Sequence, residues 1–251
     1  MKRYLVAFQF LTIIPLPFKT DCEAQDLGRS TAVFPLVGLT IGALLAGLNW
    51  LIAPWLARPL TDALLITALA AVTGALHLDG LADVCDGIAA RGGRERFLEV
   101  MKDSRVGAVG AVGIVLCLLL KWQALLAVPA GIKMQALLFV PAVARLAQVL
   151  AMTGARHARK EGLGAVFIQG AGNAQLVAAL TLTLAAAFVL PPLTGLAAYV
   201  VVIMATVALR CYFQRRLGGL TGDVAGCISE LAEIAALAVI SVRLPSSTTP
   251  F

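Results

Sequence analysis

Seven runs of apolar residues, each long enough to cross a lipid bilayer, constrain the fold of this chain more than any other feature. A helix that spans a bilayer needs about 17–25 mostly apolar residues. The candidate runs are, to within a few residues, 33–55, 60–78, 106–128, 134–154, 174–192, 195–213 and 223–243. The sequence therefore predicts an all-α fold, a polytopic membrane bundle of about seven transmembrane helices that forms a single integral-membrane domain over residues 1–251.

The composition excludes an ordinary soluble domain. Hydrophobic residues make up 60% of the chain and charged residues only 14%, whereas soluble domains average about 45–50% apolar and about 25% charged residues. The net charge of +6 would suit a nucleic-acid partner. The basic residues, however, lie in short segments between apolar runs, and we find no nucleic-acid motif. The expected partner surface is therefore the lipid bilayer, and no nucleic acid is expected.

Basic residues also predict the orientation. If the N-terminus is cytosolic, most of the 20 lysines and arginines fall in cytosolic segments, as the positive-inside rule requires. Lys121 and Arg145 are exceptions, because both fall inside predicted spans. The start, "MKRYLVAFQFLTIIPLPFK", resembles a signal peptide but lacks a small-residue cleavage site after its apolar core. We expect an uncleaved amphipathic or re-entrant helix there.

The stretch "HLDGLADVCDG", residues 77–87, places Asp79, Asp83 and Asp86 directly after an apolar run. On a helix their spacing aligns the three carboxylates along one stripe, where they repel one another. Mg²⁺ relieves such repulsion, since it prefers hard oxygen ligands and commonly bridges one or two carboxylates to substrate phosphates. His77 and Cys85 match this metal poorly. A purely structural role for the three acids is the alternative.

A second group of acids follows at the same spacing on "RERFLEVMKDSR": Glu95, Glu99 and Asp103. If that segment is a helix folded back on the first, two carboxylate stripes face each other and hold metal against a diphosphate. Arg91 and Arg105 would then clamp the phosphates. The alternative is a solvated helix, because basic residues alternate with these acids.

Glycine-bearing segments lie at the same predicted face. Gly107, Gly110 and Gly113 begin an apolar run, where small residues permit close helix packing or a helix N-terminus receives a phosphate. "RRLGGLTGDVAG" places Thr221 and Asp223 at the head of the last helix, and Asp223 there is either an N-cap or part of a phosphate site. Glu230 lies two turns further on, where capping does not explain it. Taken together, these residues indicate metal-assisted phosphoryl transfer at a cytosolic membrane face.

Six segments in this chain resemble the cobalamin synthases, which are adenosylcobinamide-GDP ribazoletransferases. "HLDGLADVCDG" followed by "MKDSRVGAVG" is similar to the family signature. The others, spread over most of the chain in the family's order, are "FQFLTIIPLP", "FPLVGLTIG" (34–42), "EGLGAVFI" (161–168) and "LGGLTGDVAGCISELAE" (217–233).

The resemblance implies that a hydroxyl of α-ribazole, or of its 5′-phosphate, attacks the phosphoryl group on the cobinamide of adenosylcobinamide-GDP, and that GMP leaves. It implies a multi-pass protein of the bacterial cytoplasmic membrane that requires Mg²⁺ and faces the cytosol. Association with other late cobalamin-pathway enzymes, and a homo-oligomer, stay open. On this basis we expect Asp79, Asp83, Asp86 and Asp103 to bind metal, with Asp79 and Asp103 catalytic. The expected phosphate-site residues are Arg91, Arg105, Thr221, Asp223 and Glu230.

Two other functions stay open. Residues 83–91 also resemble the D-x-x-D-G-x-x-A-R start of CDP-alcohol phosphotransferases, but the second half of that motif, G-x-x-x-D-x-x-x-D, is not reproduced. A membrane phosphotransferase of that kind is therefore the first alternative. A transporter is the second, and it predicts acids near the bilayer midplane and related halves. We find the acids clustered at one face, and no internal repeat.

Overall fold

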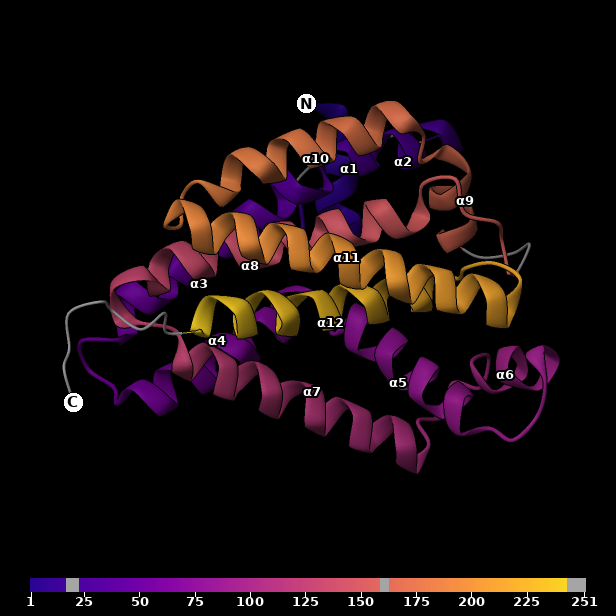
Figure 1. Cartoon of the computed structure of the whole chain (residues 1–251), viewed down its shortest axis with the longest axis horizontal. Coiled ribbons are helices and arrows are strands. Elements are labelled where there is room, and N and C mark those ends of the chain that lie inside the picture. The colour runs from indigo at the N-terminus through magenta and orange to yellow at the C-terminus, as the bar shows by residue number, and fades with distance from the viewer. Residues whose placement is uncertain (17–22, 159–162, 243–251) are drawn as a thin grey trace.

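The computed structural model describes residues 1–16, 23–158 and 163–242 as a bundle of α-helices (Figure 1). Two single 3₁₀ turns, Thr31–Val33 and Ala130–Ile132, precede α3 and α8. The helices are α1 (Lys2–Leu11), α2 (Ala24–Ser30), α3 (Phe34–Ile52), α4 (Arg58–Val72), α5 (Leu76–Ala89), α6 (Arg94–Val100), α7 (Ala108–Ala127), α8 (Lys133–Met152), α9 (Leu163–Gly170), α10 (Asn173–Ala187), α11 (Pro192–Leu217) and α12 (Gly222–Ser241).

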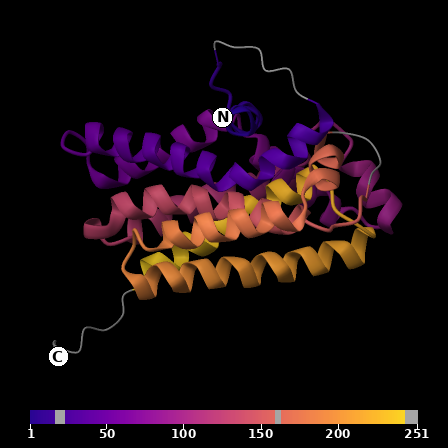
Figure 2. The same ribbon diagram turned by 90° about the horizontal axis from the view of Figure 1, so that it is seen from above.

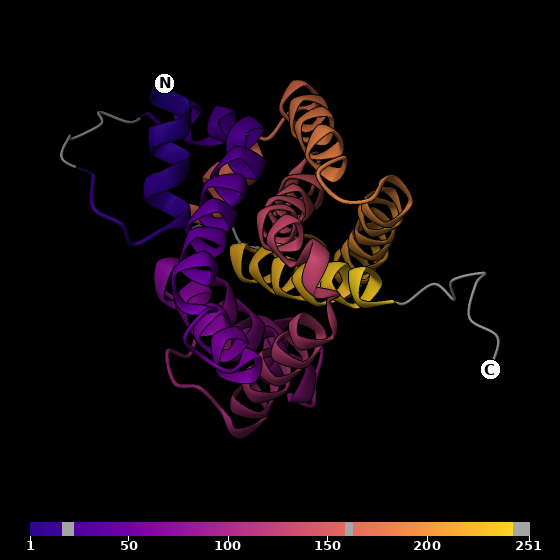
Figure 3. The same ribbon diagram turned by 90° about the vertical axis from the view of Figure 1, so that its left-hand side faces the viewer.

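Helix α8 is the centre of the bundle. It packs against α3, α10, α11 and α12, and its residues from Phe139 to Val149 are all buried. Figure 2 shows the long helices lying side by side, and Figure 3, seen along the long axis, shows α8 enclosed between these neighbours. Apolar residues cover most of α8, which suits this position because every face of the helix meets protein.

Small residues allow α3 to approach α8 closely. A Cβ atom at Gly38 would lie 2.5 Å from the carbonyl oxygen of Pro141, and one at Gly42 would lie 2.6 Å from that of Leu137. Lipid tails are as apolar as the helix surfaces, so such close contact, rather than burial from water, holds membrane helices together.

Gly38→Val is therefore expected to destabilise the fold by about 1–3 kcal/mol, the usual cost of overpacking. Gly47→Val is the matched control, since Gly47 lies on the same helix with no atom within 4 Å of its missing Cβ. Thermal unfolding in detergent checks the pair. Equal loss of stability in both variants would contradict the close approach seen at Gly38.

The predicted spans agree with the structure at five of the seven positions, and the other two fall on bent pairs of helices. Five helical segments are long and apolar enough to cross a membrane alone, and the number reaches seven if each of two bent pairs counts as one span. The run predicted at 60–78 is not one helix: α4 and α5 meet at 89°. Gly74 and Ala75, with φ of 60° and 55°, make this turn. Helices α9, described from Gly164 on, and α10 form the other bent pair, at 93°.

The N-terminal segment forms the predicted short amphipathic helix. In α1 the residues Val6, Ala7, Phe8 and Leu11 are buried. The hydroxyls of Tyr4 and of Thr40 on α3 lie 2.7 Å apart.

Helices α6 and α9 and the end of α11 lie at one end of the bundle, at the right in Figure 1. Arg94 ties α6 to that end by donating to the backbone oxygens of Leu217 and Ala158.

Candidate active site

Helix α5 carries the acidic stripe that the spacing predicts. Asp79 is exposed, while Asp83 and Asp86 are half-buried. Helix α5 also packs on α12, where a Cβ atom at Gly80, the residue after Asp79, would lie 2.7 Å from the backbone oxygen of Asp223. The acids of α5 and the N-terminus of α12 are therefore neighbours, as a shared site requires.

Asp86 binds the N-terminus of α7. Its two carboxylate oxygens accept hydrogen bonds from the backbone N–H groups of Gly107, at 2.7 Å, and Gly110, at 2.8 Å. A helix N-terminus attracts an anion because its first N–H groups lack partners. The glycine-rich start that we considered for a phosphate is thus occupied by a carboxylate of the chain itself. Side chains at Gly107 and Gly110 would collide with Asp86.

Asp103 pairs with Arg105 in the loop before α7. The guanidinium donates from Nε at 3.0 Å and from Nη2 at 2.8 Å, and the Arg105 backbone N–H donates at 3.1 Å. The side-chain hydrogen bond from Arg105 lowers the pKa of Asp103 to about 2. A carboxylate with such a pKa is a weak proton acceptor at neutral pH. The geometry therefore favours Asp103 as the partner that positions Arg105, rather than as the general base.

The second group of acids does not form one continuous stripe along a helix that faces the first. Helix α6 ends at Val100, so Asp103 lies beyond it. The Glu95 and Glu99 side chains are 88% and 68% exposed, and Glu99 pairs with Arg96 at 2.8 Å. The residue of α6 that meets α5 is Phe97, whose ring lies against Gly87. A solvated acidic face, the alternative interpretation, is what the structure has, because the buried side of α6 is aromatic.

A hollow of about 600 Å³ lies between the end of α5, helix α6 and the start of α7. It brings together three of the predicted residues, Asp86, Asp103 and Arg105, with Arg96 and Glu99 also in its lining. Arg91, just beyond α5, is exposed and makes no hydrogen bond or ion pair within the described ranges. This end of the bundle therefore presents arginines of the kind that bind phosphates.

The four acids predicted as metal ligands are not assembled into one cluster. Among residues 1–16, 23–158 and 163–242, no three His, Cys, Asp or Glu side chains form a group that could hold a metal ion. Mg²⁺ usually takes only one or two carboxylates, together with substrate phosphates. The exposed Asp79 and its neighbour one turn on, Asp83, fit that smaller donor set. Asp86 accepts hydrogen bonds from α7 and Asp103 from Arg105, and Asp83 also has an interaction within the chain.

At the head of α12 the N-cap is Thr221, not Asp223. The Thr221 hydroxyl oxygen accepts a hydrogen bond from the backbone N–H of Val224 at 3.2 Å. Asp223 lies in the first turn, where the helix dipole favours a negative charge. Both residues line a cavity beside α5, so the structure keeps them at the candidate site.

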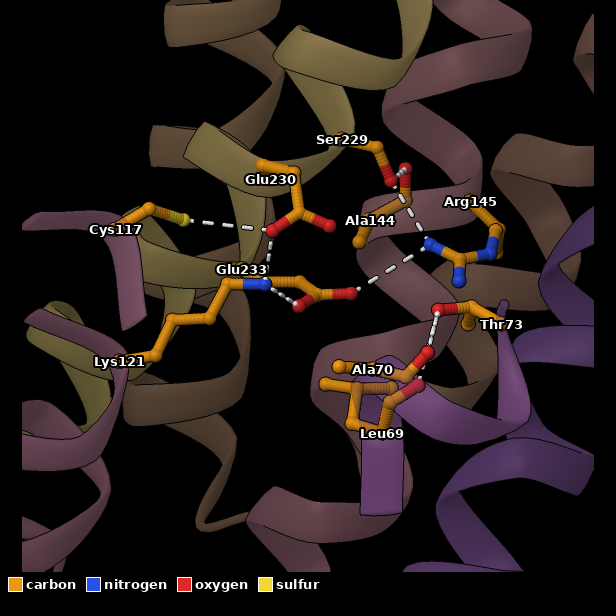
Figure 4. A network of polar contacts seen from close by, with 10 residues as sticks. All are labelled: Leu69, Ala70, Thr73, Cys117, Lys121, Ala144, Arg145, Ser229, Glu230 and Glu233. Carbon is orange, nitrogen blue, oxygen red and sulfur yellow. Dashed lines mark hydrogen bonds and ion pairs between the residues drawn. The ribbon is translucent and has the colours of Figure 1, made fainter. Parts of the chain in front are cut away.

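Glu230 lies in a buried ion network rather than in this cavity (Figure 4). Lys121 of α7 contacts both Glu230 and Glu233 of α12 at 2.5 Å, and Arg145 of α8 lies 3.5 Å from Glu233. Two positive and two negative side chains thus neutralise one another inside the bundle, as buried charges must. The carboxylate of Glu230 is committed to Lys121, which leaves its predicted phosphate contact without geometric support.

The cavity beside α5, called here the aromatic cavity, has a volume of about 250 Å³. Helices α1, α3, α5, α8, α9 and α12 enclose it. Its lining includes three phenylalanines, Phe10, Phe34 and Phe167, and two buried polar residues, His77 and Gln148. Sequence reasoning missed the cavity, because its walls come from segments far apart in the chain. It also missed the ion network. Lys121 and Arg145 lie within predicted spans, and basic residues there usually pair with buried acids, so their positions were a signal of such a network.

The fold and the site define a class of protein: a polytopic helical membrane protein with acids, arginines and two hollows at one end of its bundle. The chain belongs to the cobalamin-5-phosphate synthase family, whose family model matches residues 3–241.

Curated relatives match along nearly their whole length, and three of them are named adenosylcobinamide-GDP ribazoletransferase. The protein of Geotalea daltonii is 56% identical over 94% of this chain and 96% of its own. That of Syntrophobacter fumaroxidans is 44% identical over 91% and 93%, and that of Klebsiella pneumoniae is 36% identical over 93% and 97%. No solved structure matches this chain.

Proposed function

We propose that this chain joins adenosylcobinamide-GDP to α-ribazole, or to α-ribazole 5′-phosphate, and releases GMP. The observation that carries the proposal is the acidic stripe of α5, which runs from the aromatic cavity at its start to the 600 Å³ hollow at its end. A reaction between two substrates needs two binding places on either side of the reacting groups. Family membership supplies the identity of those substrates.

The chemistry balances without an oxidant or reductant. A ribazole hydroxyl oxygen attacks the phosphorus attached to cobinamide, a new P–O bond forms, and the P–O bond to the GMP phosphate breaks. The bonding electron pair leaves with GMP, and the hydroxyl proton passes to a carboxylate or to solvent. Positioning and charge neutralisation supply most of the acceleration in such transfers.

The predicted residues other than Glu230 take places in this scheme. The Asp79 side chain makes no hydrogen bond or ion pair within the described part of the chain, so its carboxylate is available to accept the proton or to bind metal. Arg91 and Arg105 contact the diphosphate, and Asp103 holds the Arg105 guanidinium in place. Asp86 fixes the start of α7 against α5 and so shapes the hollow. Thr221 and Asp223 border the ribazole side.

Mg²⁺ is part of the proposal. Asp79 and Asp83 would hold it together with substrate phosphate oxygens, and when bound it neutralises charge on the transferring group.

We further propose that the site faces the cytosol of a bacterial cytoplasmic membrane. The arginines at this end of the bundle support that orientation, since basic residues accumulate on the cytosolic side. Association with other late cobalamin-pathway enzymes, or with further copies of this chain, would suit such a location.

Release of GMP in proteoliposomes tests the proposed function. The purified full-length chain is expected to form GMP only when both substrates and Mg²⁺ are present, and to stop when EDTA removes the metal. Adding CDP-diacylglycerol with an alcohol tests the CDP-alcohol alternative, which predicts CMP instead. Formation of CMP, or no GMP from an intact and folded preparation, would overturn the proposal.

A further inference from the structure

We propose that the aromatic cavity binds the flat heterocyclic base of the ribazole substrate. The identity of the nucleoside rests on the proposed function, whereas the chemical nature of the ligand is inferred from the cavity itself. Four properties support it: unpaired buried polar groups, aromatic walls, size, and position beside the acids of α5.

Two buried polar side chains in the cavity lack partners. His77 and Gln148 are 3% and 4% exposed. Both imidazole nitrogens of His77 and the side-chain oxygen of Gln148 make no hydrogen bond within the described residues. Leaving a buried polar group unpaired costs about 1–3 kcal/mol. Such groups gathered at one cavity indicate a ligand that carries the missing hydrogen-bonding atoms.

The walls suit an aromatic ring. The Phe167 ring centroid lies 4.2 Å from that of Phe10 and 5.6 Å from that of Phe34. Aromatic side chains stack on the faces of heterocyclic bases and contribute about 1–3 kcal/mol for each base. A benzimidazole base has a mostly apolar edge and one ring nitrogen that is not joined to the ribose. That nitrogen accepts one hydrogen bond, and a neutral imidazole offers one N–H donor.

The volume of the cavity suits the base of the ribazole substrate better than the corrin ring or guanine of the other substrate. Pockets for drug-sized ligands hold about 300–1,000 Å³, so a cavity of about 250 Å³ takes a single small base and excludes a corrin ring. Guanine fits less well, because it carries acceptors and donors on several edges that would all need partners. The apolar walls leave most of those edges unpaired.

The cavity also lies where the nucleoside must react. Its lining includes Gly222 and Asp223 of α12, and the Asp223 backbone packs against Gly80, the residue next to Asp79. A base held between the phenylalanines and His77 therefore lies beside the acidic stripe. Its ribose hydroxyls have a short path to the phosphorus that is attacked.

Equilibrium dialysis of the full-length protein in nanodiscs tests the proposal without turnover. The probes are dimethylbenzimidazole, which is the isolated base of α-ribazole, then α-ribazole itself, and GDP. His77→Phe and Gln148→Leu keep the approximate volume and remove hydrogen-bonding atoms. Each is expected to weaken binding of the base and of α-ribazole about tenfold or more, and to leave GDP binding unchanged.

Two further variants separate a binding role from a structural one. Asn49→Leu removes a buried amide whose oxygen is also unpaired but which lies on α3 outside the cavity, so base binding should stay at the wild-type level. Ala165→Phe places a ring in the cavity and leaves His77 and Gln148 intact. It is expected to block base binding in a protein whose elution volume and thermal midpoint remain those of the wild type.

The outcomes distinguish this inference from the proposed function. If wild-type protein releases GMP but the cavity variants bind the base normally, the inference fails and the function stands. If GDP rather than the base is lost from these variants, the occupant is guanine and the inference also fails. If the base binds in a cavity-dependent way but no GMP forms, the function fails and the cavity assignment stands. In active variants, a raised KM for α-ribazole alone supports the inference.

Discussion

Asp79→Asn is expected to lower the rate of GMP release by at least about a hundredfold, the scale on which enzymes lose activity without a positioned acid or base. Asp79 is exposed on the first turn of α5, and its side chain makes no hydrogen bond or ion pair within the described residues. The substitution removes one negative charge and keeps the shape. Folding should therefore be unaffected, as size-exclusion profiles and thermal midpoints in detergent would show.

The matched control is Glu95→Gln. It removes one negative charge from a side chain that is 88% exposed on α6. Its activity should remain within about twofold of the wild type, because an exposed charge adds little at this distance through water. Near wild-type turnover by Asp79→Asn, or equal losses in both variants, would remove Asp79 from the catalytic site.

Lys121→Met is expected to cost about 3–5 kcal/mol of stability, the scale measured when one partner of a buried ion pair is removed. The Lys121 side chain is 3% exposed and contacts two carboxylates on α12. Without it, Glu230 and Glu233 share only Arg145, so one negative charge stays uncompensated inside the bundle. The thermal midpoint in detergent and the yield of monodisperse protein measure the loss.

A double variant that restores the charge balance of the ion network tests its assignment more sharply than Lys121→Met alone. The double substitution Lys121→Met with Glu230→Gln leaves Glu233 paired with Arg145 and should recover most of the lost stability. Lys102→Met is the surface control, since Lys102 is exposed between α6 and α7 and should tolerate the change. If the double variant were less stable than Lys121→Met, the assignment of the network as a neutral set of four would be wrong.

Much of this protein could be predicted from its sequence because lipid imposes a simple rule. The apolar runs predicted the helices that cross the bundle, and their bounds differ from the observed ones by only a few residues in most cases. The spacing of Asp79, Asp83 and Asp86 predicted one acidic stripe, and α5 has it. The family was also identified from six short segments, and the match over residues 3–241 confirms it.

A local sequence pattern does not show a partner that comes from elsewhere in the chain. Asp86 resembled a metal ligand by spacing, yet α7 supplies backbone N–H groups that occupy both of its oxygens. Glu230 resembled a site residue, yet Lys121, more than a hundred positions away, takes its charge. Glu95 and Glu99 kept the spacing of α5 but lie on a helix whose aromatic side faces inward.

The sequence by itself determined that this chain is a helical membrane protein and which helix carries the stripe of three aspartates, because hydropathy and helical periodicity act over short distances. Only the tertiary structure decided which of those acids remain available, and where a substrate base would fit. Availability depends on whether another helix brings a donor to the same carboxylate. The aromatic cavity exists only where α1, α3, α5, α8, α9 and α12 meet, and no single segment of the chain encodes it.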